Sequence, residues 1–318
     1  MSASPLPLRL RQIRHEAEDV VSLELVAAHG GPLPAFSAGA HIDFLLPGEK
    51  VRSYSLVNDP AETHRYVVAV LKEREGKGGS IWLHDRPRVG DVLEARPPVN
   101  DFPLAAEASE SVLIGGGIGI TPLMSMVRQL EREGREWRLH LAARSPRHAA
   151  FLDELRSLDA GRGRVVLHCG ARDHTRMDIA RLVADAPAGA HFYCCGPSRM
   201  IDAYLAACTA LPPERVHVER FAAASEAATA GGFELVLQRS GRRIAVAPGK
   251  TMLDALLDQG VQVQYACSVG VCGTCMTGVI EGEPDHRDEY LTEEERADNR
   301  HIMICCSGSK SPTLVLDL

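Results

Sequence analysis

The chain has 318 residues, of which 45% are hydrophobic and 24% charged, so it is long enough for two or three domains with cores of their own. Its net charge of −7 argues against non-specific binding to nucleic acid. Residues Met1–Pro5 lack the start of a secretory signal, and no run of about 18 apolar residues could span a bilayer. We therefore expect a cytoplasmic protein with reduced thiols, bound neither to membrane nor to nucleic acid. The sequence leaves the oligomeric state open, and a monomer is the preferred expectation.

Short β-prone runs broken by Gly, Pro and Asp fill the first third of the chain. Such a pattern is typical of a small antiparallel barrel, which we place at residues 1–106. The runs are Leu8–Ile13, Val20–Ala27, His41–Leu46, Arg52–Val57 and Arg65–Leu71.

Two segments of this barrel have the chemistry to hold a phosphate and a planar ring. The run Arg52–Ser55 offers a guanidinium fork, hydroxyl donors and an aromatic ring. The segment Lys72–Ser80 ends in Gly79 and Ser80 before a helix predicted over Ile81–His84, so the helix N-terminus could face the same anion. The alternatives are a bare surface strand and a glycine-rich turn in which Ser80 is an ordinary N-cap.

At Ser111 the pattern changes to strands that alternate with helices, which predicts a parallel sheet in a nucleotide-binding domain over residues 107–222. Strand Ser111–Ile114, the glycine turn Gly115–Pro122 and the helix Leu123–Glu133 form a crossover in which a pyrophosphate can approach the backbone. The turn departs from the spacing G-x-G-x-x-G. Further strands are predicted at Arg138–Ala143, Val165–Cys169 and Ala190–Cys195, and helices near Ala149–Leu158, Asp178–Val183 and Ser198–Leu211.

The sequence Cys194-Cys195-Gly196-Pro197 ends the last of these strands, where ligands gather in open α/β sheets. Burial within the strand is the alternative for both cysteines, and we keep it for Cys194.

The last part of the chain, residues 233–318, follows an Ala-rich stretch with a Gly pair that predicts a flexible linker over residues 223–232. A hairpin is predicted from Phe233–Gln238 and Arg243–Ala247, a helix over Met252–Gln259, and a strand at His301–Ile304. The acidic segment Thr292–Asp298 begins with a capping box. A solvated helix face is the safer interpretation of this segment, and a docking surface for an electron acceptor is the alternative.

Four cysteines of this part have the spacing of a plant-type 2Fe-2S site. Cys267, Cys272 and Cys275 form C-x4-C-x2-C, and Cys305 follows after 29 residues. A tetrahedral zinc site is an alternative, although zinc sites usually pair two C-x2-C hooks. A disulfide framework is disfavoured by the chain length and by the odd count of nine cysteines. Cys306 directly follows Cys305, but the 29-residue gap favours Cys305 as the fourth ligand and leaves Cys306 as a buried free thiol.

Taken in order along the chain, five motifs resemble the phthalate dioxygenase reductase family, which includes vanillate demethylase reductase subunits. They are Arg52-x-Tyr54-Ser55, the turn Gly115–Pro122, Cys195-Gly196-Pro197, Glu219-x-Phe221 and the cysteine loop. The resemblance covers essentially the whole chain, and the ferredoxin domain placed last is its most specific mark. It implies an FMN-binding barrel, an NAD-binding α/β domain and a β-grasp ferredoxin domain.

The resemblance also implies roles for individual residues. The flavin would be bound by Arg52, Ser53, Tyr54, Ser55, Gly79 and Ser80, and the dinucleotide by Gly117, Gly119, Thr121, Pro122, Cys195, Gly196 and Pro197. Phe221, Ser55 and Cys195 would lie beside the reacting rings, and Cys267, Cys272, Cys275 and Cys305 would hold the cluster.

These assignments define an electron path. A nicotinamide gives up two electrons as a hydride, whereas an iron–sulfur cluster accepts one electron at a time, so a flavin must separate the pair. By resemblance we expect a reductase that passes electrons from NADH through FMN and a 2Fe-2S cluster to a Rieske-type aromatic oxygenase or O-demethylase. The alternatives are a cytochrome P450 or a carnitine-type monooxygenase as acceptor, and a redox-sensing binding protein. Arg144 and Arg147 leave NADPH open, and the choice of FMN over FAD depends on the resemblance.

Overall fold

The computed structural model describes residues 5–48, 50–76, 78–170, 177–221, 226–265 and 267–318. The chain divides into two compact units between Arg220 and Phe221, and each is described by itself. Three predictions fall partly outside the described residues: the start of the chain at residues 1–4, the first residues of the linker at 222–225, and two single positions, 77 and 266, in the glycine-rich and cysteine loops.

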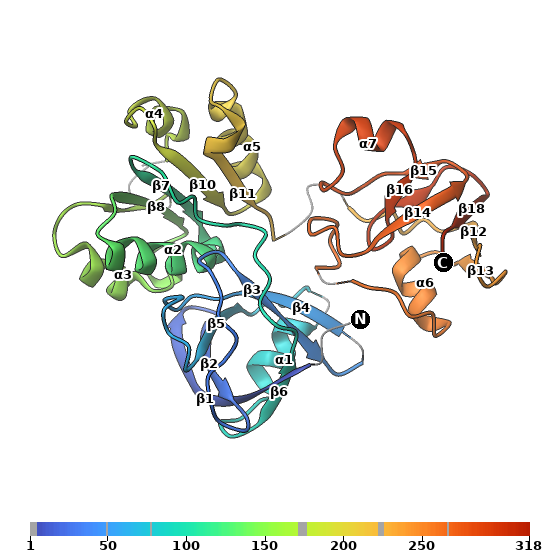
Figure 1. Ribbon diagram of the computed structural model, residues 1–318, viewed down its shortest axis with the longest axis horizontal. Helices are drawn as coiled ribbons and strands as arrows, with labels where there is room; N and C mark the ends of the chain where they lie inside the picture. The colour runs from blue at the N-terminus through green and yellow to red at the C-terminus, as the bar shows by residue number, and fades with distance from the viewer. Residues whose placement is uncertain (1–4, 49, 77, 171–176, 222–225, 266) are drawn as a thin grey trace. The chain divides into compact units, whose positions relative to one another are not determined.

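The first half of unit 1 is a six-stranded antiparallel sheet in the order β4-β3-β6-β1-β2-β5 (Figure 1). A β-bridge between Leu56 and Val68 joins the end of β4 to β5, so the sheet closes on itself as the predicted barrel. The strands are β1 Leu6–Ala17, β2 Val20–Ala27, β3 His41–Leu46, β4 Lys50–Ser55, β5 Tyr66–Leu71 and β6 Val92–Ala95. The sequence analysis missed β6, which is only four residues long and partly exposed.

One helix of the barrel differs from its prediction. Helix α1 spans Gly79–Asp85, so it begins two residues earlier than predicted, and Gly78 is its N-cap with a φ of 86°. Glycine adopts this left-handed conformation without the steric cost that a side chain adds. The alternative in which Ser80 caps the helix is therefore wrong, because Ser80 lies inside the first turn.

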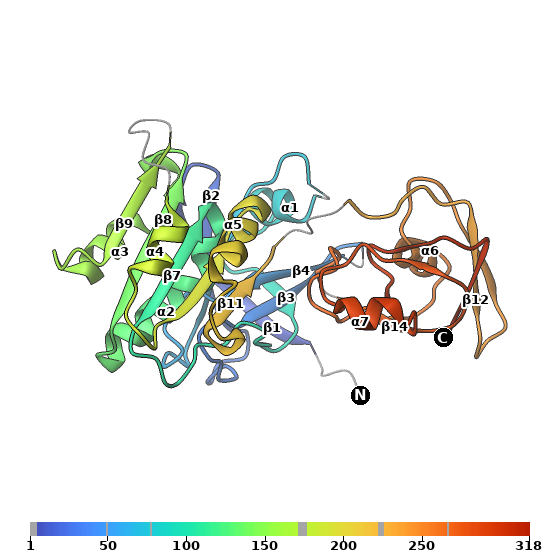
Figure 2. The same cartoon turned by 90° about the horizontal axis from the view of Figure 1, so that it is seen from above.

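The second half of unit 1 is a parallel five-stranded sheet in the order β11-β10-β7-β8-β9 (Figures 1 and 2). Helices α2 and α3 cover one face and α4 and α5 the other. The strands are β7 Ser111–Gly116, β8 Trp137–Ala143, β9 Val165–Cys169, β10 His191–Cys195 and β11 Val216–Glu219. The helices are η1 Gly117–Gly119, α2 Ile120–Glu133, η2 Pro146–His148, α3 Leu152–Asp159, α4 Ile179–Ala184, α5 Ser198–Cys208 and η3 Pro213–Arg215. The parallel sheet is confirmed, but edge strand β11 was not predicted.

The barrel and the parallel sheet share one hydrophobic core. Ala17, Val57 and Ala69 of the barrel belong to the same buried cluster as Leu123 and Met126 of α2. Polar contacts cross the same boundary: the N–H of Gly39 donates to Ser125 Oγ at 3.1 Å, and the N–H of Ala105 donates to the Tyr193 hydroxyl at 2.9 Å. The barrel and sheet are therefore packed as one body.

Unit 2 is an α+β domain with a five-stranded sheet in the order β13-β12-β18-β14-β16. Strands β12 and β18 are parallel, and the other pairs are antiparallel. The elements are β12 Phe233–Leu237, β13 Arg243–Val246, α6 Met252–Asp258, β14 Met276–Glu281, β15 Pro284–Asp285, α7 Glu293–Ala297, β16 His301–Met303, β17 Gly308–Ser309 and β18 Thr313–Leu316. The predicted three-domain fold class is thus confirmed.

The second half of the expected linker belongs to unit 2. The N–H of Ala228 donates to the carbonyl of Cys306 at 2.7 Å, and the N–H of Gly232 donates to that of Val246 at 2.9 Å. Thr229 accepts a further hydrogen bond from the N–H of Gly249. Residues 226–232 are therefore fixed on the ferredoxin domain, which differs from the flexible connection predicted.

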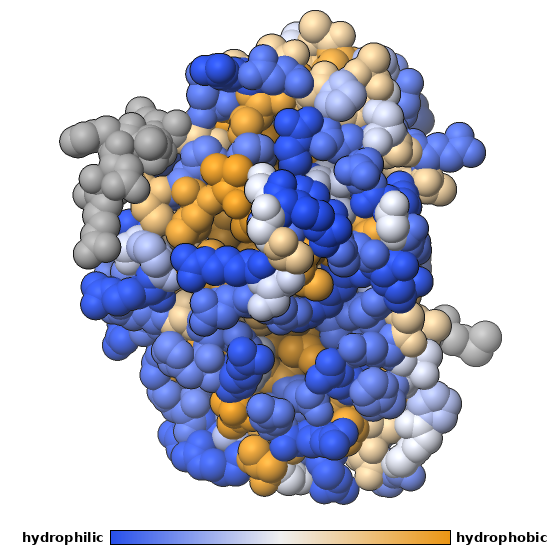
Figure 3. Space-filling view, turned by 90° about the vertical axis from the view of Figure 1, so that its left-hand side faces the viewer, coloured by the Kyte–Doolittle hydropathy of each residue, from blue (hydrophilic) through white to orange (hydrophobic). Residues whose placement is uncertain are grey.

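On the face of the molecule shown in Figure 3, hydrophilic residues predominate and hydrophobic residues form separate patches. Among the residues that the structure covers, no helix combines the length and the apolar composition needed to cross a membrane.

Candidate functional site

The predicted phosphate-binding residues of the barrel come together in space. A Cβ atom placed at Gly79 would lie only 2.8 Å from Cγ of Arg52, so the arginine side chain packs directly over the first residue of α1. The N-cap of this helix makes no side-chain hydrogen bond to the first turn. A guanidinium and free helix N–H groups therefore lie side by side, which suits one phosphate.

Ser53, Tyr54 and Ser55 differ in what their side chains contact. The Ser53 hydroxyl donates to Asp43 Oδ1 at 2.6 Å and is therefore already engaged. Tyr54 packs beside Phe44, with ring centroids 5.8 Å apart, and burial raises the pKa of its hydroxyl to about 12 against the opposing charge of Arg52. The Ser55 hydroxyl is buried without a hydrogen-bond partner in the described structure.

An unpartnered buried hydroxyl costs about 1–3 kcal/mol, so it indicates a missing acceptor or donor. A flavin ring edge carries oxygen and nitrogen atoms of the kind that Ser55 lacks as a partner among the described residues, and the assignment of Ser55 to the ring stays a prediction. Ser80, by contrast, uses its Oγ to accept a hydrogen bond from the N–H of Glu73 at 3.0 Å. The role of Ser80 in phosphate binding remains a prediction, and its backbone N–H is the group that is suited to it.

The nucleotide-binding turn is built on close approach of two backbones. Strand β7 runs to Gly116, and a short 3₁₀ turn leads into α2 at Ile120, three residues earlier than predicted. A Cβ atom at Gly119 would overlap the carbonyl of Cys195, and one at Gly116 would lie 2.7 Å from Pro197. Glycine is therefore required here so that the loops after β7 and β10 can touch.

Thr121 and Pro122 lie inside the first turn of α2 rather than in the loop before it. Thr121 is 2% exposed, and its hydroxyl donates to the carbonyl of Ile118 at 2.9 Å. Pro122 is buried as well. These two residues shape the turn, while the backbone from Gly117 to Gly119 is what can face a pyrophosphate.

Cys195 and Glu219 are neighbours on the parallel strands β10 and β11. The Cys195 side chain is fully buried, and burial followed by the charge of Glu219 raises the pKa of its thiol well above the usual value. Burial, reinforced by Asp101, raises the pKa of Glu219 to about 8, and its Oε2 atom has no hydrogen-bond partner in the described structure. Glu219 is thus largely protonated at neutral pH.

The sequence analysis quoted Glu219 only as part of a motif and gave it no role. The signal that could have found it is an acidic residue at the end of an otherwise apolar strand, opposite a predicted site residue. Phe221, the predicted ring-stacking residue, is the first residue of unit 2 and is 41% exposed. Its stacking on a flavin stays a prediction.

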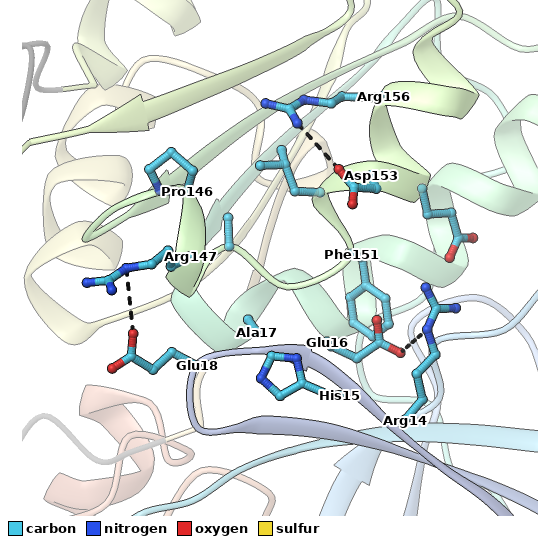
Figure 4. A pocket seen from close by; sticks show the side chains of 13 residues that line it. Arg14, His15, Glu16, Ala17, Glu18, Pro146, Arg147, Phe151, Asp153 and Arg156 are labelled. Atoms are coloured by element: carbon cyan, nitrogen blue, oxygen red, sulfur yellow. Dashed lines mark hydrogen bonds and ion pairs between the residues drawn. The ribbon is translucent and has the colours of Figure 1, made fainter.

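A cleft of about 640 Å³ lies between the turn after β1 and the N-terminal part of α3 (Figure 4). Three ion pairs lie among the residues that line it, namely Arg14–Glu16, Arg147–Glu18 and Arg156–Asp153. None of the predicted site residues lines this cleft. The predicted chemistry is instead at the β4–α1 and β7–β10 edges.

The four predicted cluster ligands meet in unit 2. The Cys267 thiol interacts with those of Cys272 and Cys305, and the Cys275 thiol interacts with that of Cys305. The contacts among these thiols lower the pKa of Cys267 and Cys275 and raise the pKa of Cys272 and Cys305. The N–H of Val269 also points to Cys267 Sγ at 3.4 Å. The donor set fits a 2Fe-2S cluster.

Cys305 and Cys306 are adjacent in the chain, but their sulfur atoms have different surroundings. Cys305 faces Cys267 and Cys275, whereas Cys306 Sγ lies against Gly270 and points to the carbonyl of Met303 at 3.8 Å. A Cβ atom at Gly270 would overlap this sulfur. This geometry favours Cys305 as the fourth ligand.

A buried carboxylate, missed by the sequence analysis, braces the cluster loop. The Asp288 side chain is 0% exposed and accepts hydrogen bonds from the N–H groups of Tyr290 and Leu291 at 3.2 and 2.9 Å. It also accepts one from the Ser307 hydroxyl at 3.4 Å. Next to it, the N–H of Glu289 donates to the carbonyl of Gly270 at 3.0 Å. Asp288 thus links the cysteine loop to the strand that follows Cys305.

Comparisons with known proteins agree with the domains in which these residues lie. Residues 113–205 match the oxidoreductase NAD-binding domain, and residues 235–309 match the 2Fe-2S iron–sulfur cluster binding domain. The chain is 53% identical to the phenoxybenzoate dioxygenase subunit beta of Ectopseudomonas oleovorans, over 99% of this chain and 98% of that protein. It is 47% identical to the tetrachlorobenzoquinone reductase of Sphingobium chlorophenolicum, with the same coverage.

Among solved structures, phthalate dioxygenase reductase superimposes with a TM-score of 0.85 at 39% identity. The match covers 99% of this chain and 98% of that one. That structure is described as a module for electron transfer from pyridine nucleotides to a 2Fe-2S centre. The likeness thus includes both units of the fold.

Proposed function

Because the chain belongs to the phthalate dioxygenase reductase family, we propose that it is the reductase component of a two-component Rieske-type aromatic oxygenase or O-demethylase. It is an NADH-dependent oxidoreductase of oxygenase systems that uses FMN and a 2Fe-2S cluster. The proposal concerns the acceptor and the roles of individual residues.

Bound FMN would supply the chemistry that side chains lack, separation of an electron pair into single electrons. On the barrel side, Arg52 and the first N–H groups of α1 would neutralise and orient its phosphate. The Ser55 hydroxyl would hydrogen-bond to the ring, which satisfies its unpartnered Oγ. Tyr54 would pack against the ring with its hydroxyl protonated at every physiological pH.

On the nucleotide side, the backbone of Gly117–Gly119 would hold the pyrophosphate of NADH at the start of α2. Cys195 would pack beside the nicotinamide as a neutral thiol. Glu219 would hold a proton on its buried carboxyl, so this crevice carries no extra negative charge near neutral pH. The protein thereby positions two rings and excludes water, with no acid–base pair needed for hydride transfer.

The observation that carries the proposal is the place of the cysteine site within the chain. The four cysteines lie in a compact unit separate from the one that holds the flavin and nucleotide residues. A one-electron carrier on a unit of its own is suited to deliver electrons to another protein. The relative from Ectopseudomonas oleovorans is named as a subunit of a dioxygenase, which supports an oxygenase acceptor.

The first experiment is an anaerobic NADH titration of the purified protein, followed by visible absorbance and EPR, with chromatography of the released flavin. We expect flavin bleaching, a rhombic EPR signal of a reduced 2Fe-2S cluster, and FMN as the flavin. Zinc in a colourless protein would contradict the cluster and the function together.

The acceptor is tested by single-turnover reduction of purified oxygenases. We expect reduction of a Rieske-type aromatic oxygenase, faster than that of a cytochrome P450 or a carnitine-type monooxygenase. Turnover of tetrachlorobenzoquinone with no Rieske protein reduced would favour the activity for which the relative from Sphingobium is named. The monomeric state and the cytoplasmic location belong to the same proposal, and sedimentation analysis checks the monomeric state.

A further inference from the structure

An exposed aromatic ring covers the cluster loop of unit 2. A Cβ atom placed at Gly273, between Cys272 and Cys275, would overlap the Tyr290 ring. Gly273 has a φ of 73°, so both its conformation and the ring above it disfavour a side chain at this position. Tyr290 is nevertheless 50% exposed. One face of the ring therefore contacts the cysteine loop while another part of it faces water.

A second residue with an exposed apolar side chain is joined to the same glycine through its backbone. The N–H of Met276 donates to the carbonyl of Gly273 at 2.9 Å, and the Met276 side chain is 46% exposed. Met276 directly follows the predicted ligand Cys275. An aromatic and a thioether side chain thus flank the loop at the point where its sulfurs come nearest to the surface, since Cys272 is only half-buried.

Negative charge concentrates next to this pair of side chains. Residues 233–318 carry 13 acidic and 8 basic side chains, a net charge of −5 out of −7 for the whole chain. Six of the 13 acidic residues lie in residues 288–298. Glu293 and Glu294 of α7 are exposed, three and four positions after Tyr290, and the capping box of Thr292 and Glu295 fixes the start of the helix.

We propose that the acceptor protein docks on this surface, with Tyr290 and Met276 at the centre of the contact and basic side chains of the acceptor opposite Glu293 and Glu294. The inference rests on the proposed function and names the surface through which it is carried out. Each NADH becomes NAD⁺ with release of one proton and two electrons, and each docking event passes one electron to the acceptor. Two events therefore complete one turnover.

Physical reasons favour these side chains over others. Electron transfer slows steeply with distance, so an acceptor must approach the cysteine loop itself. Tyr, Met and Arg are enriched at protein interfaces, and a rigid aromatic anchor contributes most when it lies at the centre. An acidic rim steers a basic partner toward that centre and adds a salt-dependent attraction.

The test uses the full-length holoprotein and measures both binding and electron transfer. Its probe is a Rieske oxygenase that the wild-type protein reduces or, if none is reduced, ferric cytochrome c, which is a basic protein. Affinity is measured by calorimetry at low and high salt, and EPR checks that each variant keeps its cluster. Ferricyanide reduction by NADH serves as an activity that needs no protein docking.

We expect Tyr290→Ala to weaken binding roughly tenfold or more, and Tyr290→Phe to keep it within about twofold, because the ring and not the hydroxyl makes the contact. Met276→Gln should show a smaller loss. Glu293→Gln with Glu294→Gln should weaken binding at low salt only. Two variants serve as matched controls. One is Ile280→Ala on β14, the strand of Met276, where the Ile280 side chain is 57% exposed, and the other is Asp153→Asn in unit 1. Ferricyanide reduction should change in none of them.

Two results would overturn the docking surface: wild-type affinity in Tyr290→Ala and Met276→Gln with an intact EPR signal, or losses equal to those of the Ile280→Ala control. If Tyr290→Ala loses its cluster, Met276→Gln and the charge variants decide. Failure of the proposed function looks different, because then the wild-type protein itself reduces no Rieske oxygenase while the variants still differ toward cytochrome c.

Discussion

At the scale of single residues, the buried carboxyl of Asp288 and the partly buried carboxyl of Glu219, whose Oε2 atom is enclosed, require different explanations. A carboxylate without access to water is stable only when hydrogen-bond donors surround it. Asp288 has three such donors, whereas Glu219 Oε2 has none in the described structure. Asp288 is therefore an organiser of the cluster loop, and Glu219 avoids the cost of its charge by keeping a proton.

We predict that Asp288→Asn weakens the hold on the cluster, because an amide replaces one acceptor oxygen with a donor that faces backbone N–H groups. Hydrogen bonds to a charged group contribute about 1.5–3 kcal/mol each, so chelator-driven iron release should accelerate at least tenfold. The loss of visible absorbance over time measures it. The control is Asp285→Asn, which removes an exposed partner of Arg287 nearby. Equal release rates in Asp288→Asn and wild type would contradict this role.

Glu219 gives a prediction for how the free energy of unfolding depends on pH. Its pKa in the folded protein, about 8, lies above that of an exposed glutamate, so the folded state holds more protons than the unfolded state from about pH 4.5 to 8. The free energy of unfolding therefore falls as pH rises through this window. Glu219→Gln should remove this slope and become more stable relative to wild type from pH 5 to 8.5. Urea unfolding at four pH values tests it, and parallel curves for the two proteins would rule it out.

These residues also mark how far sequence reasoning reached. Cysteine spacing alone brought four ligands together, since few chemistries use C-x4-C-x2-C with a distant fourth cysteine. The 29-residue gap favoured Cys305 over Cys306, but the contact that distinguishes the two sulfurs, Cys306 Sγ against Gly270, is visible only in the fold. Asp288 was invisible for a related reason: its donors come from residues that only the fold brings to it.

At the scale of elements, the boundaries that moved are those where glycine decides the backbone path. Most strands with clear apolar runs were predicted within a few residues, but β14 and β18 of the ferredoxin sheet were missed. Helix α1 begins earlier than predicted because Gly78 adopts a left-handed φ of 86° at its N-cap. Helix α2 begins earlier because Gly119 lets its first turn form against the backbone of Cys195. Strands β6 and β11 were missed because each is four residues long and gains its hydrogen bonds from distant partners. Pairing of this kind leaves little periodicity in the sequence.

The contact between the loops after β7 and β10 gives the prediction at this scale. Gly119→Ala would force a methyl group into the carbonyl of Cys195, although the φ of −62° suits alanine. The two loops must separate, so we expect a loss of about 1–3 kcal/mol in stability and a rise of roughly tenfold or more in the Kd for NADH. Gly170→Ala is the control, because no atom of the described residues lies within 4 Å of a Cβ atom there. Unchanged NADH affinity in Gly119→Ala would refute the close-contact argument.

At the scale of the whole molecule, the number of sequence-predicted domains differs from the number of compact units. The boundary predicted at residue 106 stays a prediction, since the buried cluster around α2 includes barrel residues on one side of it and sheet residues on the other. Composition and motif order distinguish three domains by their chemistry. They do not report that two of these share a core, because the contacts join residues far apart in the chain.

This arrangement predicts two cooperative unfolding transitions in calorimetry of the holoprotein, one for residues up to Arg220 and one for the ferredoxin unit. Removal of FMN should lower the Tm of the transition of residues up to Arg220 only, and removal of iron should lower the Tm of the ferredoxin unit only. Ser125→Ala identifies the former independently, because it leaves the N–H of Gly39 without its acceptor in the core between barrel and sheet. A lost buried hydrogen bond of about 1–3 kcal/mol should lower that Tm by roughly 2–10 °C and leave the second transition in place. Three transitions, with only one of the first two responding to Ser125→Ala, would show that barrel and sheet unfold separately in spite of their shared core.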